Sequence, residues 1–191
     1  SAAQLNPNSW RAIHNRGVSY AGMGRIDEAI ADFDRTIELN PRYANAFFNR
    51  GELLVGRNQV QEAMSDYQRA IELGPTDAAM HNSLGMAYSR LRQTGDALRE
   101  FSKAVELEAT YAPALVNRGE AYVALGRYGD AAADFRAAIA ADPNQPRAYQ
   151  AAAWLMATCP DGHYRDEKLA IEAANKALEL DGENYRNLES L

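Results

Sequence analysis

The sequence contains little of what catalytic and metal-binding sites usually require. Its 191 residues include one cysteine, Cys159, and three histidines. A single cysteine cannot form a disulfide within the chain, so the sequence gives no evidence for an oxidising compartment. Cys159 and His163 are spaced as C-x3-H, but a zinc site needs two further ligands and none follows nearby. We therefore expect no metal and no cofactor.

Long apolar runs and basic clusters are also absent. No run approaches the roughly 18 apolar residues that a membrane span needs. The formal net charge of −6 argues against a nucleic-acid footprint, which gathers lysine and arginine on one face. Residues 1–7 lack the basic start and apolar middle of a signal peptide. We expect no membrane insertion, no nucleic-acid partner and, with no targeting segment in this fragment, a cytoplasmic location.

What the sequence does contain is a regular internal repeat. Four glycines are evenly spaced along the chain, at Gly17, Gly51, Gly85 and Gly119. Alanines recur in a second register with the same spacing, at Ala29, Ala63, Ala97 and Ala131. An aromatic ring occupies the fourth position after each of these alanines, at Phe33, Tyr67, Phe101 and Phe135. Prolines close three of the units, at Pro41, Pro75 and Pro143. Several independent positions therefore repeat together.

This pattern, G-x2-Y…A-x3-F…P with a period of about 34 residues, resembles the tetratricopeptide repeat of bacterial type, in which each unit is a helix–turn–helix. The resemblance covers essentially the whole chain. The four regular repeats are 10–43, 44–77, 78–111 and 112–145, and a variant fifth repeat is 146–184. The resemblance implies an all-α fold, a right-handed superhelical solenoid of antiparallel helix hairpins that forms one continuous solenoid.

The residue types within a unit fit a pair of helices. Apolar residues step by three or four, as amphipathic helices require. A glycine inside a helix costs about 1 kcal/mol relative to alanine, so we expect Gly17 and its equivalents to admit the Ala29-type residue of the second helix. Gly24, Asn58 and Gly126 separate the two helices and tolerate the left-handed conformation. The predicted pairs are 10–23 and 26–39, 44–56 and 60–73, 78–91 and 94–108, 112–125 and 128–141, and 146–158 and 166–180.

The fifth repeat departs from the pattern. Ala153 stands where the glycine belongs, and the stretch from it to Ala170 is longer than the equivalent stretch from Gly119 to Ala131. We therefore predict a five-residue insertion that forms a loop centred on residues 158–164. Residues 1–9 match the tail of a preceding repeat, and residues 185–191 match the start of a further helix. We interpret the chain as an excised part of a longer array.

The resemblance implies that the first helix of each pair lines a concave groove. The sixth residue of each regular unit would face it: Asn15, Asn49, Ser83 and Asn117. An amide offers both a donor and an acceptor, which suits the backbone of an extended peptide. The row resembles the asparagine ladder in the tetratricopeptide superhelix of O-linked N-acetylglucosamine transferase. The alternative is that these asparagines cap or bond neighbouring helices.

The other predicted groove residues mix apolar, polar and charged side chains, as recognition surfaces do. They are Arg11, His14, Phe48, Glu52, Asn82, Met86, Arg90, Val116, Glu120, Gln150 and Trp154, with Arg147 beside them. Trp154 could instead belong to the core, and charges of both signs leave the sign of the partner open. The carboxylate clamp of chaperone-binding members is absent, because no asparagine occupies a ninth position and no lysine a fifth.

Three arginines that follow the asparagines invite a phosphate-binding hypothesis. They are Arg16, Arg50 and Arg118, and each precedes an aspartate by the same interval, at Asp32, Asp66 and Asp134. The third repeat changes both positions together, to Leu84 and Glu100. We therefore predict structural Arg–Asp pairs, with the aliphatic stems packed between helices.

Three functional hypotheses remain. The first is a non-catalytic protein–protein interaction scaffold that binds an extended peptide or a partner protein in the groove. The second is a structural or self-association spacer in a larger protein, with weak homo-oligomers formed through exposed ends. The third is a small-molecule or enzymatic site in the groove or in the 158–165 loop. We expect no enzyme, because the sequence has no phosphate loop or nucleophile elbow and its histidines occupy different repeat phases.

Overall fold

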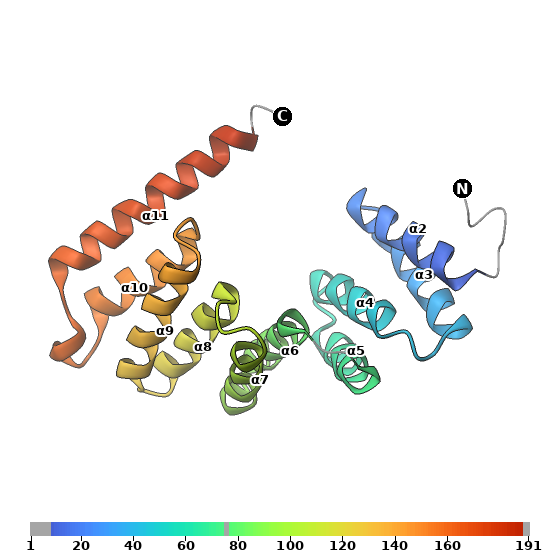
Figure 1. The fold of residues 1–191 in the computed structure, drawn as a ribbon, viewed down its shortest axis with the longest axis horizontal. Coiled ribbons are helices and arrows are strands. Elements are labelled where there is room, and N and C mark those ends of the chain that lie inside the picture. Colours follow the sequence, from blue (N-terminus) through green and yellow to red (C-terminus); the bar gives the residue numbers. More distant parts are fainter. Residues whose placement is uncertain (1–8, 75–76, 189–191) are drawn as a thin grey trace. The chain divides into compact units, whose positions relative to one another are not determined.

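The structure, a computed structural model, describes residues 9–74 and 77–188, with side chains as far as Gly182. This part of the chain is all-α, as the sequence predicts, and contains no strand. The helices are α2 Trp10–Gly22, α3 Ile26–Leu39, α4 Ala44–Gly56, α5 Val60–Leu73, α6 Ala78–Arg90, α7 Thr94–Leu107, α8 Ala112–Ala124, α9 Tyr128–Ala141, α10 Pro146–Thr158, the 3-10 helix η1 Gly162–Tyr164 and α11 Glu167–Leu188 (Figure 1).

The chain divides into an N-terminal unit, residues 1–92, and a C-terminal unit, residues 93–191. In the N-terminal unit α2 packs on α3, α3 on α4, α4 on α5 and α5 on α6. The C-terminal unit repeats this order from α7 to α11. Within each unit, helices therefore contact their neighbours in sequence, which is the packing of a repeat array.

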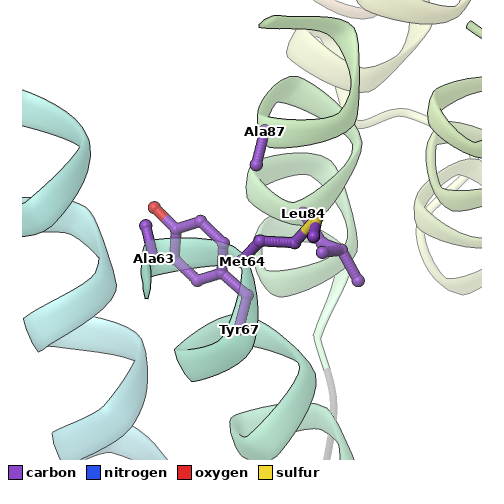
Figure 2. Packing of buried hydrophobic residues seen from close by; sticks show 5 residues of the cluster. All are labelled: Ala63, Met64, Tyr67, Leu84 and Ala87. Carbon is purple, nitrogen blue, oxygen red and sulfur yellow. The ribbon is translucent and has the colours of Figure 1, made fainter. Parts of the chain in front are cut away.

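Each repeat also packs onto the next repeat of its unit through a small core. In the N-terminal unit, Ala63, Met64 and Tyr67 of α5 meet Leu84 and Ala87 of α6. Figure 2 shows these side chains converging from the two helices on one shared interface. The second helix of one repeat is thus covered by the first helix of the next, so a single hairpin does not bury its own apolar surface.

The turns inside the four regular hairpins each contain one left-handed residue. Gly24, Asn58 and Gly126 have φ values of 72°, 62° and 73°, in agreement with the prediction. The third hairpin places Arg92 there, with φ 60°, which no sequence signal indicates. A left-handed arginine costs about 1–2 kcal/mol.

The mid-helix glycines make room for a ring, not chiefly for the Ala29-type residue as predicted. A Cβ on Gly17 would lie 2.9 Å from Cε1 of Phe33, and a Cβ on Gly51 would lie 2.7 Å from Cε1 of Tyr67. Both rings are almost fully buried. The alanines are buried too, but the aromatic side chain is what occupies the space that a larger residue would need.

This contact predicts the effect of Gly51→Ala in α4. The substitution should lower the free energy of unfolding by about 1–2 kcal/mol, because overpacking costs about 1–3 kcal/mol and alanine returns up to about 1 kcal/mol of helix propensity. Urea unfolding followed by circular dichroism measures the change. Gly56→Ala is the matched control in the same helix, since no atom lies within 4 Å of its Cβ position. A Gly51→Ala protein as stable as Gly56→Ala would contradict the contact.

The last hairpin differs from the others. A longer link, Cys159–Asp166, joins α10 to α11 and contains η1. α11 then continues through Gly182 to Leu188, so the predicted end near residue 180 is wrong. No proline follows Leu180, and an internal glycine costs only about 1 kcal/mol, which a long helix absorbs. The predicted preceding tail falls almost wholly on residues 1–8, and the end of the predicted further helix on 189–191; both lie outside the described residues.

No helix among the described residues has the length and apolarity that crossing a membrane requires. In the same part of the chain, histidine, cysteine and carboxylate side chains form no group of three or more that is suited to hold a metal ion.

Candidate functional site

The three predicted Arg–Asp pairs are formed, and each is bidentate. In the first repeat, Nε and Nη2 of Arg16 lie 2.7 and 2.6 Å from the carboxylate oxygens of Asp32. The corresponding pairs, Arg50–Asp66 and Arg118–Asp134, have distances of 2.6–2.7 Å. Hydrogen bonding to the aspartate raises the pKa of each arginine. These arginines are therefore structural, as predicted, and are not available for phosphate.

Two details extend this role. Arg50 also donates to Asp34 of the preceding repeat at 2.7 Å, so one guanidinium group joins two repeats. In the third repeat Leu84 belongs to the core shared with Tyr67, and buried Glu100 pairs with Lys103 at 2.8 Å. The concerted change seen in the sequence thus places Leu84 in an apolar core and Glu100 beside a lysine of its own helix.

The pair in the fourth repeat can be tested by Arg118→Leu. The substitution leaves the buried carboxylate of Asp134 without its partner and should lower the free energy of unfolding by about 2–3 kcal/mol. The double variant R118L/D134N should recover at least half of this loss, because it removes the uncompensated charge. Urea unfolding gives both values.

Arg99→Leu is the control for this test, because the Arg99–Asp96 pair is far more exposed. Its loss should cost less than about 1 kcal/mol. Equal effects of Arg118→Leu and Arg99→Leu would show that the buried pair has no special role.

The residues of the predicted ladder differ in their exposure to solvent. In the N-terminal unit Asn15 of α2 is exposed, whereas Asn49 of α4 and Ser83 of α6 are half-buried. In the C-terminal unit Asn117 is only 5% exposed and makes contacts of its own. Its neighbour Val116 is fully buried in the core. The accessible part of the row therefore lies on the first helices of the N-terminal unit.

His14 connects the first two asparagines. The Nδ2 group of Asn49 lies 3.0 Å from His14 Nε2, and His14 Nδ1 lies 3.4 Å from Asn15 Oδ1. An amide NH2 can only donate, so Nε2 accepts and Nδ1 carries the proton. Asn49 thus does bond a neighbouring helix, as the alternative proposed, whereas Asn15 bonds a residue of its own helix. Among the described residues, however, the NH2 of Asn15 and the oxygen of Asn49 have no side-chain partner, which leaves one donor and one acceptor.

The sequence placed His14 on the groove surface, but its side chain is buried. It is 7% exposed and packs against the rings of Phe33 and Tyr43, at centroid distances of 5.6 and 4.9 Å. Burial lowers the pKa of His14, and its hydrogen bond to Asn15 opposes this shift. The neutral tautomer described above is therefore the favoured form near neutral pH.

This shift predicts a pH-dependent stability. As pH falls through about 6.5, the unfolded chain binds a proton at His14 before the folded chain does, so the stability of the folded state decreases. H14Q should remove that part of the decrease between pH 7.5 and 5.5. Urea unfolding at both pH values measures it, with H163Q as the control at an exposed histidine. Parallel profiles for wild type and H14Q would disprove the assignment.

The remaining candidates of the N-terminal unit surround a small recess. Tyr67 donates its hydroxyl to Glu52 at 2.6 Å, and burial, followed by this bond, raises the pKa of Tyr67. Arg90 Nη1 lies 3.4 Å from the carbonyl oxygen of Val55. The recess has a volume of about 50 Å³, and it is lined by Glu52, Val55, Tyr67, Ser83, Met86, Ala87 and Arg90. It borders the core of Figure 2, which supplies its Tyr67 and Ala87.

Phe48 and Asn82 mainly contact other side chains and expose little of their own surface. Phe48 is half-buried, with its ring centroid 5.7 Å from that of Tyr67. Asn82 is 6% exposed, and its Nδ2 lies 3.6 Å from the sulfur of Met86. Met86, by contrast, reaches the surface.

In the C-terminal unit Glu120 and Gln150 of the predicted groove are engaged by other side chains. Glu120 pairs with Arg147 at 2.7 Å, and Gln150 donates to Asp181 at 3.0 Å. Trp154 is 57% exposed and is therefore a surface residue, which settles the question that its sequence position left open. The polar groups of this unit thus largely satisfy each other.

A charge division in the N-terminal unit was missed in the sequence reasoning. The first helices α2, α4 and α6 together carry four arginines and one glutamate, a net charge of +3. The second helices α3 and α5 carry eight acidic residues and two arginines, a net charge of −6. Counting charges for each helix separately would have revealed it.

Two of the four arginines on the first helices remain without a carboxylate partner among the described residues. Arg11 lies over the ring of Trp10, with its Cζ 4.5 Å from the centroid, and Arg90 only approaches a carbonyl oxygen. The single acid of these helices, Glu52, accepts from Tyr67. Because the tyrosine hydroxyl is neutral, Glu52 keeps its charge, and the first-helix surface of the N-terminal unit presents a net charge of +1 after internal pairing: Arg11 and Arg90 against Glu52.

Comparison with known proteins agrees with this architecture. The profile of the tetratricopeptide repeat family matches residues 14–78 and 82–146, more than half of the chain. None of the curated proteins compared with the chain matches it.

Three solved structures have a similar fold. YrrB, described as a TPR protein with an unusual peptide-binding site, is 22% identical, with 99% of this chain and 95% of that chain covered and a TM-score of 0.74. MamA from Desulfovibrio magneticus RS-1 is 18% identical, covers 91% and 96%, and has a TM-score of 0.76. PilF of Pseudomonas aeruginosa is 17% identical, covers 89% and 75%, and has a TM-score of 0.77. With its matched repeats and its helical hairpins, the chain belongs to the tetratricopeptide repeat family.

Proposed function

We propose that this chain is a non-catalytic interaction module whose N-terminal unit binds an extended, acidic segment of a partner protein along α2, α4 and α6. The observation that carries the proposal is that Arg11 and Arg90, on the same first helices as the accessible amides, have no carboxylate partner among the described residues. The repeat fold supports a protein or peptide partner in general, and YrrB, with its peptide-binding site, is a structural neighbour.

The amides supply contacts that do not depend on sequence. Among the described residues, the NH2 group of Asn15 and the side-chain oxygen of Asn49 have no side-chain partner. The two residues lie on α2 and α4, which contact each other. A peptide backbone offers the complementary acceptor and donor at every residue. His14 holds the two amides in these orientations, because its two ring nitrogens bond to one of them each.

The arginines supply the preference for charge. Guanidinium groups bind carboxylates with two parallel hydrogen bonds. Arg90 also borders the recess lined by Val55, Met86 and Ala87, whose volume of about 50 Å³ suits the end of one apolar side chain. The preferred segment therefore combines acidic residues with an isolated aliphatic one.

The alternative, a self-associating spacer, is favoured by a different observation. Trp154, Ile171 and Leu178 on the last hairpin are 57%, 55% and 69% exposed. Apolar side chains of this size on neighbouring helices favour contact with another protein surface. This hypothesis predicts concentration-dependent assembly instead of peptide capture.

Two labelled twelve-residue peptides of Gly, Ser and Leu, identical except for four Glu in one and four Lys in the other, test the proposal. The acidic peptide should bind about ten-fold more tightly at low salt, and the difference should shrink at high salt, because exposed charges are screened. R11Q/R90Q should remove most of the difference. N15A/N49A should weaken both peptides about equally. Fluorescence anisotropy measures the affinity of each protein for each peptide.

R35Q/R69Q is the matched control, since it removes two exposed arginines from the second helices α3 and α5. It should leave the preference unchanged. Equal binding of the two peptides would exclude the preference for acidic segments but would still support peptide binding. Binding of neither peptide, together with a mass that rises with concentration in light scattering, would support the spacer instead.

A further inference from the structure

The five-residue insertion of the last repeat folds back against the preceding hairpin. Tyr164 of η1 packs against the buried cluster of Ala131, Phe135, Leu155 and Cys159. Its hydroxyl lies 2.7 Å from where a Cβ on Gly129 would be, so the glycine of α9 gives it room. The link is thus seated on α9 as well as connecting α10 to α11.

Asp166 holds the other end of the link. Its backbone N–H donates to the carbonyl oxygen of Met156 in α10 at 3.1 Å, and its carboxylate accepts from the backbone of Leu169 at 3.0 Å. The first bond attaches the link to α10, and the second caps the start of α11. The position of α11 relative to α9 and α10 is therefore set by specific contacts.

Residues of α9, α10, η1 and α11, the elements drawn in orange and red in Figure 1, line a half-open cavity of about 560 Å³. Its apolar lining includes Phe135, Ile139, Leu155, Met156, Leu169 and Ala173. Phe135 and Leu155 are each 2% exposed, whereas Leu169 is 49% exposed. The volume falls in the range of small-molecule sites, and most of the lining is apolar as in such sites.

Two arginines of the cavity lining have no ion-pair partner among the described residues, although Asp166 and Glu172 also line it. Arg136 of α9 and Arg165 of the link line it, and neither pairs with a carboxylate among the residues described. The acids beside them are engaged elsewhere: Asp166 caps α11, and Glu172 lies 3.9 Å from Lys168. Lys176 is held by Glu179 at 3.0 Å. Two guanidinium groups therefore stand beside an apolar interior.

We propose that this cavity binds a small amphiphilic carboxylate, with its aliphatic chain on the apolar lining and its head group at Arg136 and Arg165. Guanidinium groups prefer planar carboxylates, with which they form paired hydrogen bonds. A neutral or cationic amphiphile would leave both arginines without a partner. The site lies in the C-terminal unit and does not depend on the peptide-binding role of the N-terminal unit.

Isothermal titration with dodecanoate, kept below its micelle concentration, tests the proposal on the whole chain. Saturable binding of one molecule per chain is expected, at least ten-fold tighter than binding of dodecanol. R136Q/R165Q should weaken dodecanoate binding at least ten-fold while leaving dodecanol binding unchanged. Ala173→Trp should abolish binding of both, because the indole would fill the cavity.

Both arginines are exposed, so R136Q/R165Q is expected to fold, and circular dichroism and thermal unfolding confirm this for each variant. R35Q/R69Q again serves as the charge-matched control and should bind dodecanoate as wild type does. Non-saturable binding, equal affinity for dodecanol and dodecanoate, or unchanged affinity in R136Q/R165Q would each overturn the proposal.

Discussion

The crossing of the two helices within a hairpin depends on one contact, a glycine of the first helix against an aromatic ring of the second. At Gly17 the ring of Phe33 occupies the space that a Cβ would need. Arg16 directly precedes Gly17, and Asp32 directly precedes Phe33. The close crossing of the two helices therefore brings the guanidinium nitrogens of Arg16 within 2.6–2.7 Å of the carboxylate oxygens of Asp32. Apolar packing and a bidentate ion pair therefore secure the same point of the hairpin. Because these contacts fix the helix crossing, the other side chains of the first helix can face solvent and contact a partner.

The third repeat shows which part of this arrangement can be exchanged. Leu84 and Glu100 replace the ion pair, and Leu84 joins the core with Tyr67 of the preceding repeat. The carboxylate that remains is neutralised on its own helix by Lys103. Replacing a buried ion pair by well-packed apolar groups is often neutral for stability, whereas removing one partner is costly. That asymmetry explains why the two positions differ together in the sequence.

The sequence predicted the eight helices of the four regular repeats to within one residue at each end, because glycine, alanine, aromatic and turn residues all agree in phase. It failed where tertiary packing overrides local preference. Arg92 has a left-handed backbone, although an arginine gives no signal for this conformation in the sequence. His14 occupies a groove position, yet the rings of Phe33 and Tyr43 bury it, and no periodicity shows which ring covers which neighbour. The exposed or buried state of Asn117 and the paired state of Glu120 were equally hidden.

Net charge was the least informative of the sequence observations, because it sums groups that already neutralise one another. The chain as a whole is at −6, yet the first helices of the N-terminal unit are at +3. What a partner meets is set by the charges left after internal pairing, which on these helices are Arg11, Arg90 and Glu52. The same reasoning applies to the last hairpin, where Arg136 and Arg165 remain beside an apolar cavity. The regular repeat positions form the helical scaffold. The positions that depart from the repeat carry the side chains without internal partners, and these are available to bind a partner.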